Sequence, residues 1–197
     1  MIATRTVEPT AEPITTSEVK TRIVLSTTTY DTQIGTLIKA ARRYFESFTG
    51  RALVQQTWKY YLSDWPDGDF IKLPHPPLQS VTAVRYTDSD DSQSTLSTDD
   101  YSVDTDSEPG RVVLNYGETW PTATLATNNP IEIEFVAGYD PGTSSPVDYA
   151  ENIPEGIKDA MMLMVGLLQD LPPEGYSRRM EEVIHSILGP YLVRDEF

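Results

Sequence analysis

The chain has no cysteine among its 197 residues. Disulfide bonds, thiolate nucleophiles and cysteine-ligated zinc are therefore excluded. Histidine is scarce as well: His75 lies between prolines and His185 follows an isoleucine, and we expect both to pack or to face solvent. No Gly-rich phosphate loop and no nucleophile-elbow serine occurs. We therefore expect no metal site, no cofactor and no enzymatic activity.

Long apolar runs are also absent. The longest, Ala160–Leu168, is far shorter than the roughly 20 residues that a membrane-spanning helix needs. The first residues contain no apolar run typical of a signal peptide. We expect a soluble protein that is synthesised in the cytoplasm and has no membrane partner.

Basic residues are few: 15 Lys and Arg stand against 30 Asp and Glu, and the formal net charge is −15. The excess is concentrated in residues 64–140, with a net charge of −12, whereas residues 1–63 carry +3. Neutralising phosphates needs clustered Lys and Arg, so a protein that grips the outside of nucleic acid is excluded. An acidic surface suits solubility, or a passage through which nucleic acid moves without sticking.

The acidic residues do not form a convincing site. Asp88, Asp90 and Asp91 lack the glycine and the terminal glutamate of an EF-hand calcium loop. The aspartates of residues 64–69 are typical of a turn. No carboxylate lies in an apolar setting that would raise its pKa. A hydrolase with paired carboxylates therefore stays open but is not favoured.

A helix is predicted within Thr29–Leu53, the stretch around which we expect the chain to be organised. Its apolar residues recur at steps of three and four, and Gly50 follows them as a left-handed cap. The polar residues fall on the opposite side. The expected apolar stripe is Ile34, Leu37, Ile38, Ala41, Phe45 and Phe48, and the expected solvent side is Lys39, Arg42, Arg43 and Glu46.

The other elements complete an α+β fold: a helical bundle from N- and C-terminal helices with an intervening antiparallel β-rich region. Alternation predicts strands within 53–62, 70–73, 80–86, 101–103, 111–116 and 131–135, with Val112, Leu114 and Tyr116 on one face. The expected organisation is a flexible arm (1–13), N-terminal helices (14–50), the β-rich region (51–140), a linker (141–152), C-terminal helices of the same bundle (153–188) and a tail (189–197).

Short motifs along Ile14–Leu192 occur in the order found in the head–tail connector (adaptor) family of tailed bacteriophages and gene transfer agents, which the chain resembles. They include Thr49–Leu53, Gln56–Trp58, Trp65–Pro66, Leu73–Val81, Asp106–Val112, Trp120–Pro121, Phe135–Tyr139, Ile153–Lys158 and Leu163–Gly166. The chain departs from the family pattern in its acidic loop, residues 88–98, and in its extended N-terminal arm.

The resemblance implies a structural virion protein of the head–tail neck, without enzymatic activity. About twelve copies would form a ring beneath the portal protein, extend the DNA channel and dock the next neck or tail protein. DNA would pass through without specific binding. The C-terminal segment would reach the portal, with Tyr191, Leu192 and Phe197 as candidate contacts.

Two further surfaces follow as hypotheses. The helix around Ala160–Leu168 is apolar nearly all round, so it needs burial on several sides, within the bundle or between subunits. The candidate interface residues are Met161, Met162, Leu163, Met164 and Leu167. The candidate channel-facing acidic residues are Asp88, Asp90, Asp91, Asp99 and Asp100.

A different class of protein stays open at this point. A monomeric β-rich module that binds a ligand or carbohydrate would present exposed aromatic side chains in a groove. Trp65, Trp120 and Tyr139 are the candidates for such a groove.

Overall fold

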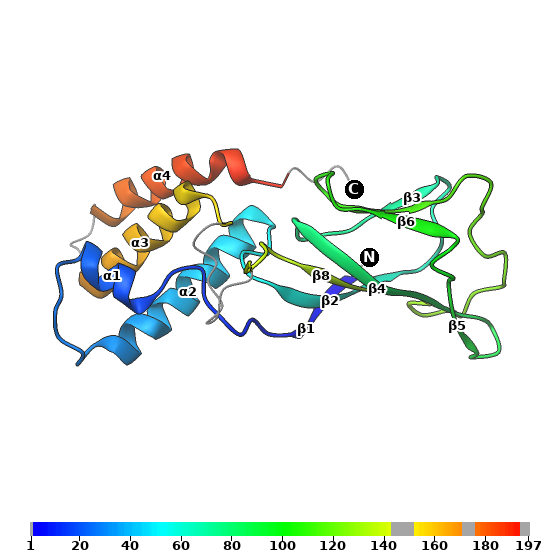
Figure 1. Ribbon diagram of the computed structural model, residues 1–197, viewed down its shortest axis with the longest axis horizontal. Coiled ribbons are helices and arrows are strands. Elements are labelled where there is room, and N and C mark those ends of the chain that lie inside the picture. Colours follow the sequence, from blue (N-terminus) through cyan, green and yellow to red (C-terminus); the bar gives the residue numbers. More distant parts are fainter. Residues whose placement is uncertain (1, 143–151, 171–175, 194–197) are drawn as a thin grey trace. The chain divides into compact units, whose positions relative to one another are not determined.

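The computed structural model describes residues 2–142, 152–170 and 176–193 (Figure 1). Within these described residues, four helices and eight strands confirm the predicted α+β fold. The chain divides into two compact units, and each is described by itself. The β unit is formed by residues 2–9 and 55–138. The helical unit is formed by the described residues of 10–54 and 139–193.

The first two helices have the predicted end signals. In α1 (Thr16–Arg22), Thr15 and Glu18 form the capping box that their spacing predicts. This helix ends at Arg22, with Ile23 as its C-cap. In α2 (Asp31–Thr49), Gly50 adopts the left-handed conformation, with φ 73°, that ends the helix without steric cost.

All four helices contribute to one hydrophobic core in the helical unit. The apolar stripe of α2 packs there against α3 (Glu155–Asp170), which is joined by α4 (Tyr176–Leu188) and the short 3-10 turn η1 (Gly189–Tyr191). Burial of apolar side chains is therefore shared between segments more than 100 residues apart in the sequence. The core includes Ile14, Val19, Ile34, Ile38, Ala41, Phe45, Leu53, Val54, Ile157, Met161, Val165, Ile184 and Leu188.

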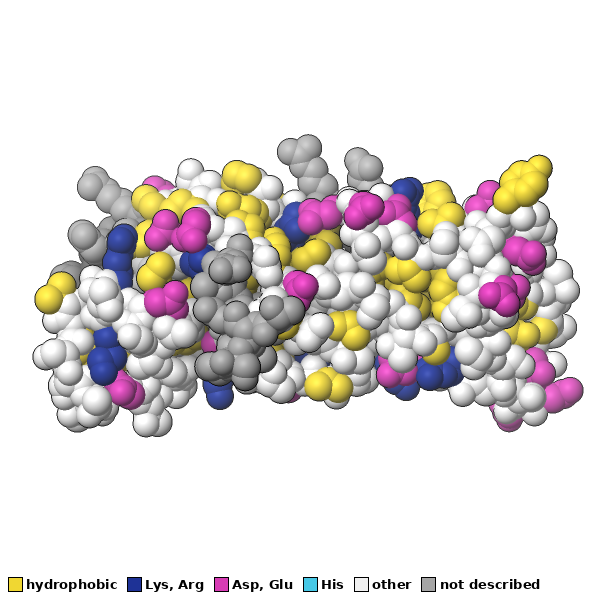
Figure 2. Space-filling view, in the orientation of Figure 1, with side chains coloured by type: hydrophobic (Ala, Val, Ile, Leu, Met, Phe, Trp, Pro, Cys, Tyr) yellow, Lys and Arg dark blue, Asp and Glu magenta, His cyan; other side chains and the backbone are white. Residues whose placement is uncertain are grey.

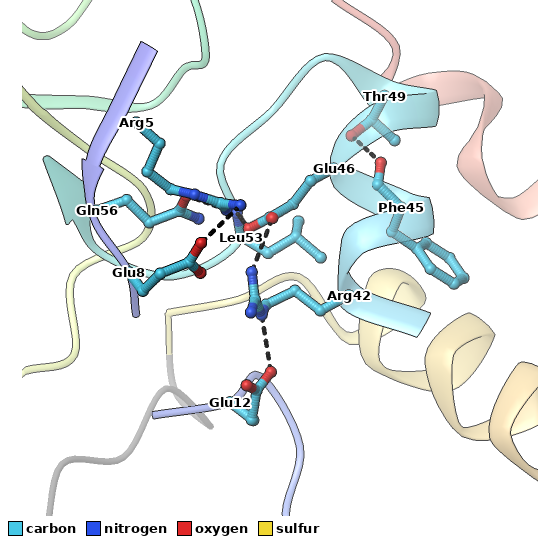
Figure 3. A network of polar contacts seen from close by, with 9 residues as sticks. All are labelled: Arg5, Glu8, Glu12, Arg42, Phe45, Glu46, Thr49, Leu53 and Gln56. Carbon is cyan, nitrogen blue, oxygen red and sulfur yellow. Dashed lines mark hydrogen bonds and ion pairs between the residues drawn. The ribbon is translucent and has the colours of Figure 1, made fainter. Parts of the chain in front are cut away.

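The buried side chain of Arg42 corrects the prediction for the polar side of α2. Its side chain is 3% exposed, and it binds Glu12 through Nε at 2.8 Å and Glu46 through Nη1 at 2.9 Å (Figure 3). Burial disfavours the charged guanidinium and by itself would lower the pKa of Arg42. The carboxylates of Glu12 and Glu46 together have the larger effect and raise this pKa. The Glu46 carboxylate also accepts a hydrogen bond from the Leu53 amide. This Arg42 cluster ties two loops to α2.

The β unit contains two antiparallel sheets, drawn as two layers in Figure 1. One sheet has the strand order β1-β2-β8-β4-β5, and the other has the order β3-β7-β6. The strands are β1 (Ile2–Val7), β2 (Gln56–Leu62), β3 (Phe70–Lys72), β4 (Leu78–Thr87), β5 (Gln93–Thr95), β6 (Tyr101–Asp104), β7 (Arg111–Leu114) and β8 (Ile131–Ala137).

Two parts of the β unit differ from the sequence prediction. The expected flexible arm was wrong for residues 2–7, which form β1 and pair antiparallel with β2. The strand expected from residue 53 begins at Gln56, because Leu53 and Val54 are buried in the core of the helical unit. Both differences depend on partners that are distant in the sequence.

Strand β8 shows the predicted alternation. Ile131, Ile133 and Phe135 are fully buried, whereas Glu132 and Glu134 point to the other face. On that face the two glutamates pair with Lys59 of β2 and Arg85 of β4, with N–O distances between 2.8 and 3.0 Å. The central strand β8 therefore has one buried apolar face and one face that carries salt bridges.

The connector Pro74–Pro77 carries the chain from the three-stranded sheet to β4 of the other sheet. His75 has φ 61° and its ring stacks on Trp58 at 4.0 Å, so it has the packing role that we expected. At the Glu-Pro-Gly turn, a Cβ added to Gly110 would lie 2.4 Å from the Leu78 Cβ. The two sheets therefore approach closely where only glycine fits.

We expect the substitution Arg42→Met to lower the free energy of unfolding by about 3 kcal/mol, because Glu12 and Glu46 would stay largely buried without their cation. Urea denaturation followed by circular dichroism measures the loss. The matched control is Arg43→Met on the exposed neighbour, for which we expect a change below about 0.5 kcal/mol. Equal losses in the two variants would contradict the role of the Arg42 cluster.

Candidate assembly surfaces

The acidic candidates lie in two connections of the β unit. Asp88, Asp90 and Asp91 belong to the turn between β4 and β5, and Asp99 and Asp100 lie between β5 and β6. Asp90, Asp91 and Asp99 are exposed, and the other two are half-buried. Figure 2 shows acidic side chains spread over the visible face of the β unit. The two connections add to that acidic surface.

Asp88 has a structural role that the sequence did not reveal. Its carboxylate accepts hydrogen bonds from the backbone N–H of Asp90 at 2.9 Å and of Ser92 at 3.0 Å. The adjacent Ser89 N–H donates to the Thr124 carbonyl at 2.9 Å, which ties this turn to the loop after β7. Asp88 therefore shapes the turn, while Asp90 and Asp91 project from it.

The loop after β7 carries a residue that the sequence prediction missed. Strand β7 ends at Leu114, so Tyr116 does not continue its buried face and is fully exposed, at 107%. Asn115 turns the chain, because its side-chain amide donates to the Asp99 carbonyl and its backbone N–H donates to the Asp100 carbonyl. The exposed aromatic ring therefore stands beside the acidic connection. No periodicity in the sequence distinguishes it from Leu114.

The apolar helix α3 uses only part of its surface within the helical unit. Met161 is fully buried in the core, and three other candidates are half-buried and packed against it: Met162, Met164 and Leu167. Leu163 is half-buried, and Leu168 is 36% exposed. Met161 is therefore buried within the helical unit, whereas Leu168 is exposed on it.

The described part of the C-terminal tail is docked on the helical unit. The Arg51 Nε donates to the Tyr191 carbonyl at 2.7 Å, and the Val193 N–H donates to the Thr49 carbonyl at 2.9 Å. Tyr191 packs against the core, whereas Leu192 is 41% exposed. Phe197 lies outside the described residues. Of the two predicted tail contacts within the described residues, Leu192 is the exposed one.

The polar side chains of the β unit form charge pairs. Hydrogen bonds from Ser107 and Arg111 hold the pKa of Asp104 far below its ordinary value. Burial raises the pKa of Glu132, but Lys59 and Arg85 outweigh it, and the net direction is downward. These two carboxylates therefore stay ionised near neutral pH. A general acid must instead carry a proton at that pH, so that it can donate it.

Within the described ranges, no three His, Asp or Glu side chains are grouped so that they can hold a metal ion. The helices of the same ranges lack the combination of length and apolarity that crossing a bilayer requires. His185 accepts or donates a hydrogen bond with the Tyr44 hydroxyl at 2.7 Å and stacks on Phe48 at 4.4 Å. It has the packing role expected from the sequence.

The aromatic residues considered for a ligand groove are used in packing. Trp65 and Trp120 stack on each other with centroids 4.9 Å apart, and the Trp120 Nε1 donates to the Gly68 carbonyl. Tyr139 packs against the core of the helical unit, which is a different unit of the chain. The structure gives no observation that favours a carbohydrate-binding module.

Comparisons with known proteins found one matching family model and several similar solved structures. A family model described as head completion protein matches residues 12–169, so the match begins after β1. Three similar solved chains come from gene transfer agent particles. The first is in the neck of an empty particle computed with C6 symmetry, with a TM-score of 0.77. The others are in the virion of a native particle (TM-score 0.75) and in the neck of a native particle computed with C12 symmetry (TM-score 0.74). Each of these chains is 18% identical to this chain in sequence, and each match covers 100% of this chain and 98% of the similar chain. This likeness shows the fold. No curated protein matches.

We expect Asp88→Ala to loosen the β4–β5 turn, because two backbone N–H groups would lose their acceptor. The cost should be about 1 kcal/mol, visible as faster amide hydrogen exchange in β5. Asp90→Ala is the matched control, since it removes the same charge from the same turn. Unchanged exchange in Asp88→Ala would show that the turn does not depend on this carboxylate.

Proposed function

The chain belongs to the head completion protein family, and we propose that it is a ring-forming subunit of a virion neck that acts by assembly and not by catalysis. Its family membership confirms the resemblance seen in the sequence. The observation that carries the proposal is the fold, which is shared over the whole chain with subunits of gene transfer agent necks. Those necks were computed with cyclic symmetry, which head-to-tail contacts between copies generate.

The proposed position in the neck is between the portal protein and the next neck or tail protein. Two exposed apolar features of the helical unit support contacts with other subunits. The first is on α3, where Leu168 is exposed and Leu163 is half-buried on a different side of the helix, and the second is Leu192 of the docked tail. We assign the first to a neighbouring copy and the second, together with Phe197, to the portal. Exposed apolar side chains lose water when a partner covers them, which stabilises the ring.

The acidic surface of the β unit suits a passage for DNA. Carboxylates repel phosphates, so a duplex moving past them gains no contacts that would hold it. We propose that Asp90, Asp91 and Asp99, which are exposed, face the channel, together with Asp100. Asp88 contributes charge as well as holding the turn.

We expect Leu163→Glu combined with Leu168→Glu to prevent ring formation, because two carboxylates would be buried between copies. Negative-stain imaging and mass photometry of the concentrated chain, alone and with its portal protein, measure assembly. The matched control is Lys39→Glu combined with Arg43→Glu on the exposed side of α2. Rings that form equally well from the leucine variant, with its helical content intact, would contradict this interface.

Reversing charge in the channel should make rings retain DNA. We expect assembled Asp90→Lys, Asp91→Lys rings to bind double-stranded DNA at about 50 mM salt and to release it at about 200 mM, because phosphate contacts are salt-dependent. A gel-shift titration measures binding. The control pair Asp159→Lys, Glu182→Lys changes the same charge at exposed positions of the helical unit. Equal DNA binding by the two pairs would argue against the proposed channel residues.

A further inference from the structure

Strand β1 (Ile2–Val7) is weakly held by its own chain. It is the outer strand of the five-stranded sheet and pairs with β2 in a register that shifts between Arg5 and Val7. None of its residues is buried: Ile2 is 56% exposed and Val7 is 52% exposed. Since burial of apolar area is the main stabilising contribution, mostly edge hydrogen bonds keep β1 in place.

The side chains of β1 contact β2, and Arg5 also pairs with Glu8 of its own segment at 3.1 Å. The Arg5 Nη1 donates to the Gln56 Oε1 at 2.9 Å (Figure 3), and its guanidinium lies 5.6 Å from the centre of the Trp58 ring. The Thr6 hydroxyl donates to the Thr57 carbonyl at 3.2 Å. A second copy of β1, placed on the same β2, would make each of these contacts unchanged. The β2 edge is therefore complementary to β1 from any copy of the chain.

The segment after β1 is short and stiff. Residue 12 is already fixed, because the Glu12 carboxylate binds Arg42, and Ile14 is buried in the core of the helical unit. Only residues 8–11 lie between this point and β1, and four residues span at most about 14 Å. Pro9 restricts this hinge further. A short hinge limits how the attached strand can fold back on its own chain, which favours exchange of the strand between copies.

We propose that β1 is an exchanged strand: in the assembled ring it leaves its own β2 and pairs with β2 of the next copy. This inference rests on the proposed ring function. Exchange in one direction around the ring is a head-to-tail contact, which closes under cyclic symmetry. It links neighbours by backbone hydrogen bonds without requiring a new complementary surface.

A disulfide between β1 and β2 tests the exchange, because the chain has no cysteine of its own. Thr4 and Lys59 are Cα partners, and antiparallel partners have the spacing that a disulfide needs. The experiment assembles the full-length Thr4→Cys, Lys59→Cys variant into rings, oxidises it and runs it on a denaturing gel without reductant. We expect a ladder at multiples of 22.1 kDa that collapses on reduction.

The matched control is Thr4→Cys with Thr57→Cys, since Thr57 is paired with Val7 and lies on the same face as Lys59. It should give a much fainter ladder. Rings whose oxidised chains all run as monomers, with the disulfide found by mass spectrometry within one chain, would overturn the exchange and leave the ring proposal standing. If the wild-type chain forms no ring, alone or with its portal, the ring proposal fails and the exchange fails with it.

Discussion

The apolar stripe of α2 must be buried, and the rest of the structure follows from how the chain meets that requirement. The helix that covers it is α3, which begins more than 100 residues later. The chain must therefore leave the helical unit, complete two antiparallel sheets and return to the same core. Met161 and Val165 of α3 then pack with Phe45 of α2. Apart from β1, the β unit is in effect a long insertion between two halves of one helical core.

This arrangement separates the chemical properties of the two units. Apolar side chains that exceed the need of a single core are concentrated on α3, in the helical unit. Negative charge is concentrated in the β unit, where most basic residues are paired, as Arg111 is with Asp104 at 2.6 Å. A subunit with an apolar helix in one unit and a carboxylate-rich surface on the other has surfaces that suit both assembly and leaving DNA unbound. That division of roles is the physical basis of the proposed function.

The candidate surfaces were only partly predictable. The sequence indicated acidic connections and an apolar helix, and the structure contains both. It did not show that Asp88 accepts two backbone hydrogen bonds, nor that Tyr116 lies beyond the end of β7. An alternating pattern continues to Tyr116, but β7 ends at Leu114, which pairs with Tyr101, the first residue of its antiparallel partner β6. The neighbouring strand in the sheet sets the length of a strand, and the local sequence pattern does not identify that neighbour.

The sequence alone specified those features that depend on interactions between residues close together in the chain. The capping box at Thr15, the left-handed Gly50 and the alternation of β8 all follow from residues within a few positions of one another. The tertiary structure decided the fate of Arg42 and of β1. A guanidinium on the polar side of a helix is buried only if distant carboxylates reach it, and an N-terminal segment becomes a strand only if an unpaired edge is available. Both depend on long-range contacts, because the free energy of a buried charge or a strand edge is set by its partner.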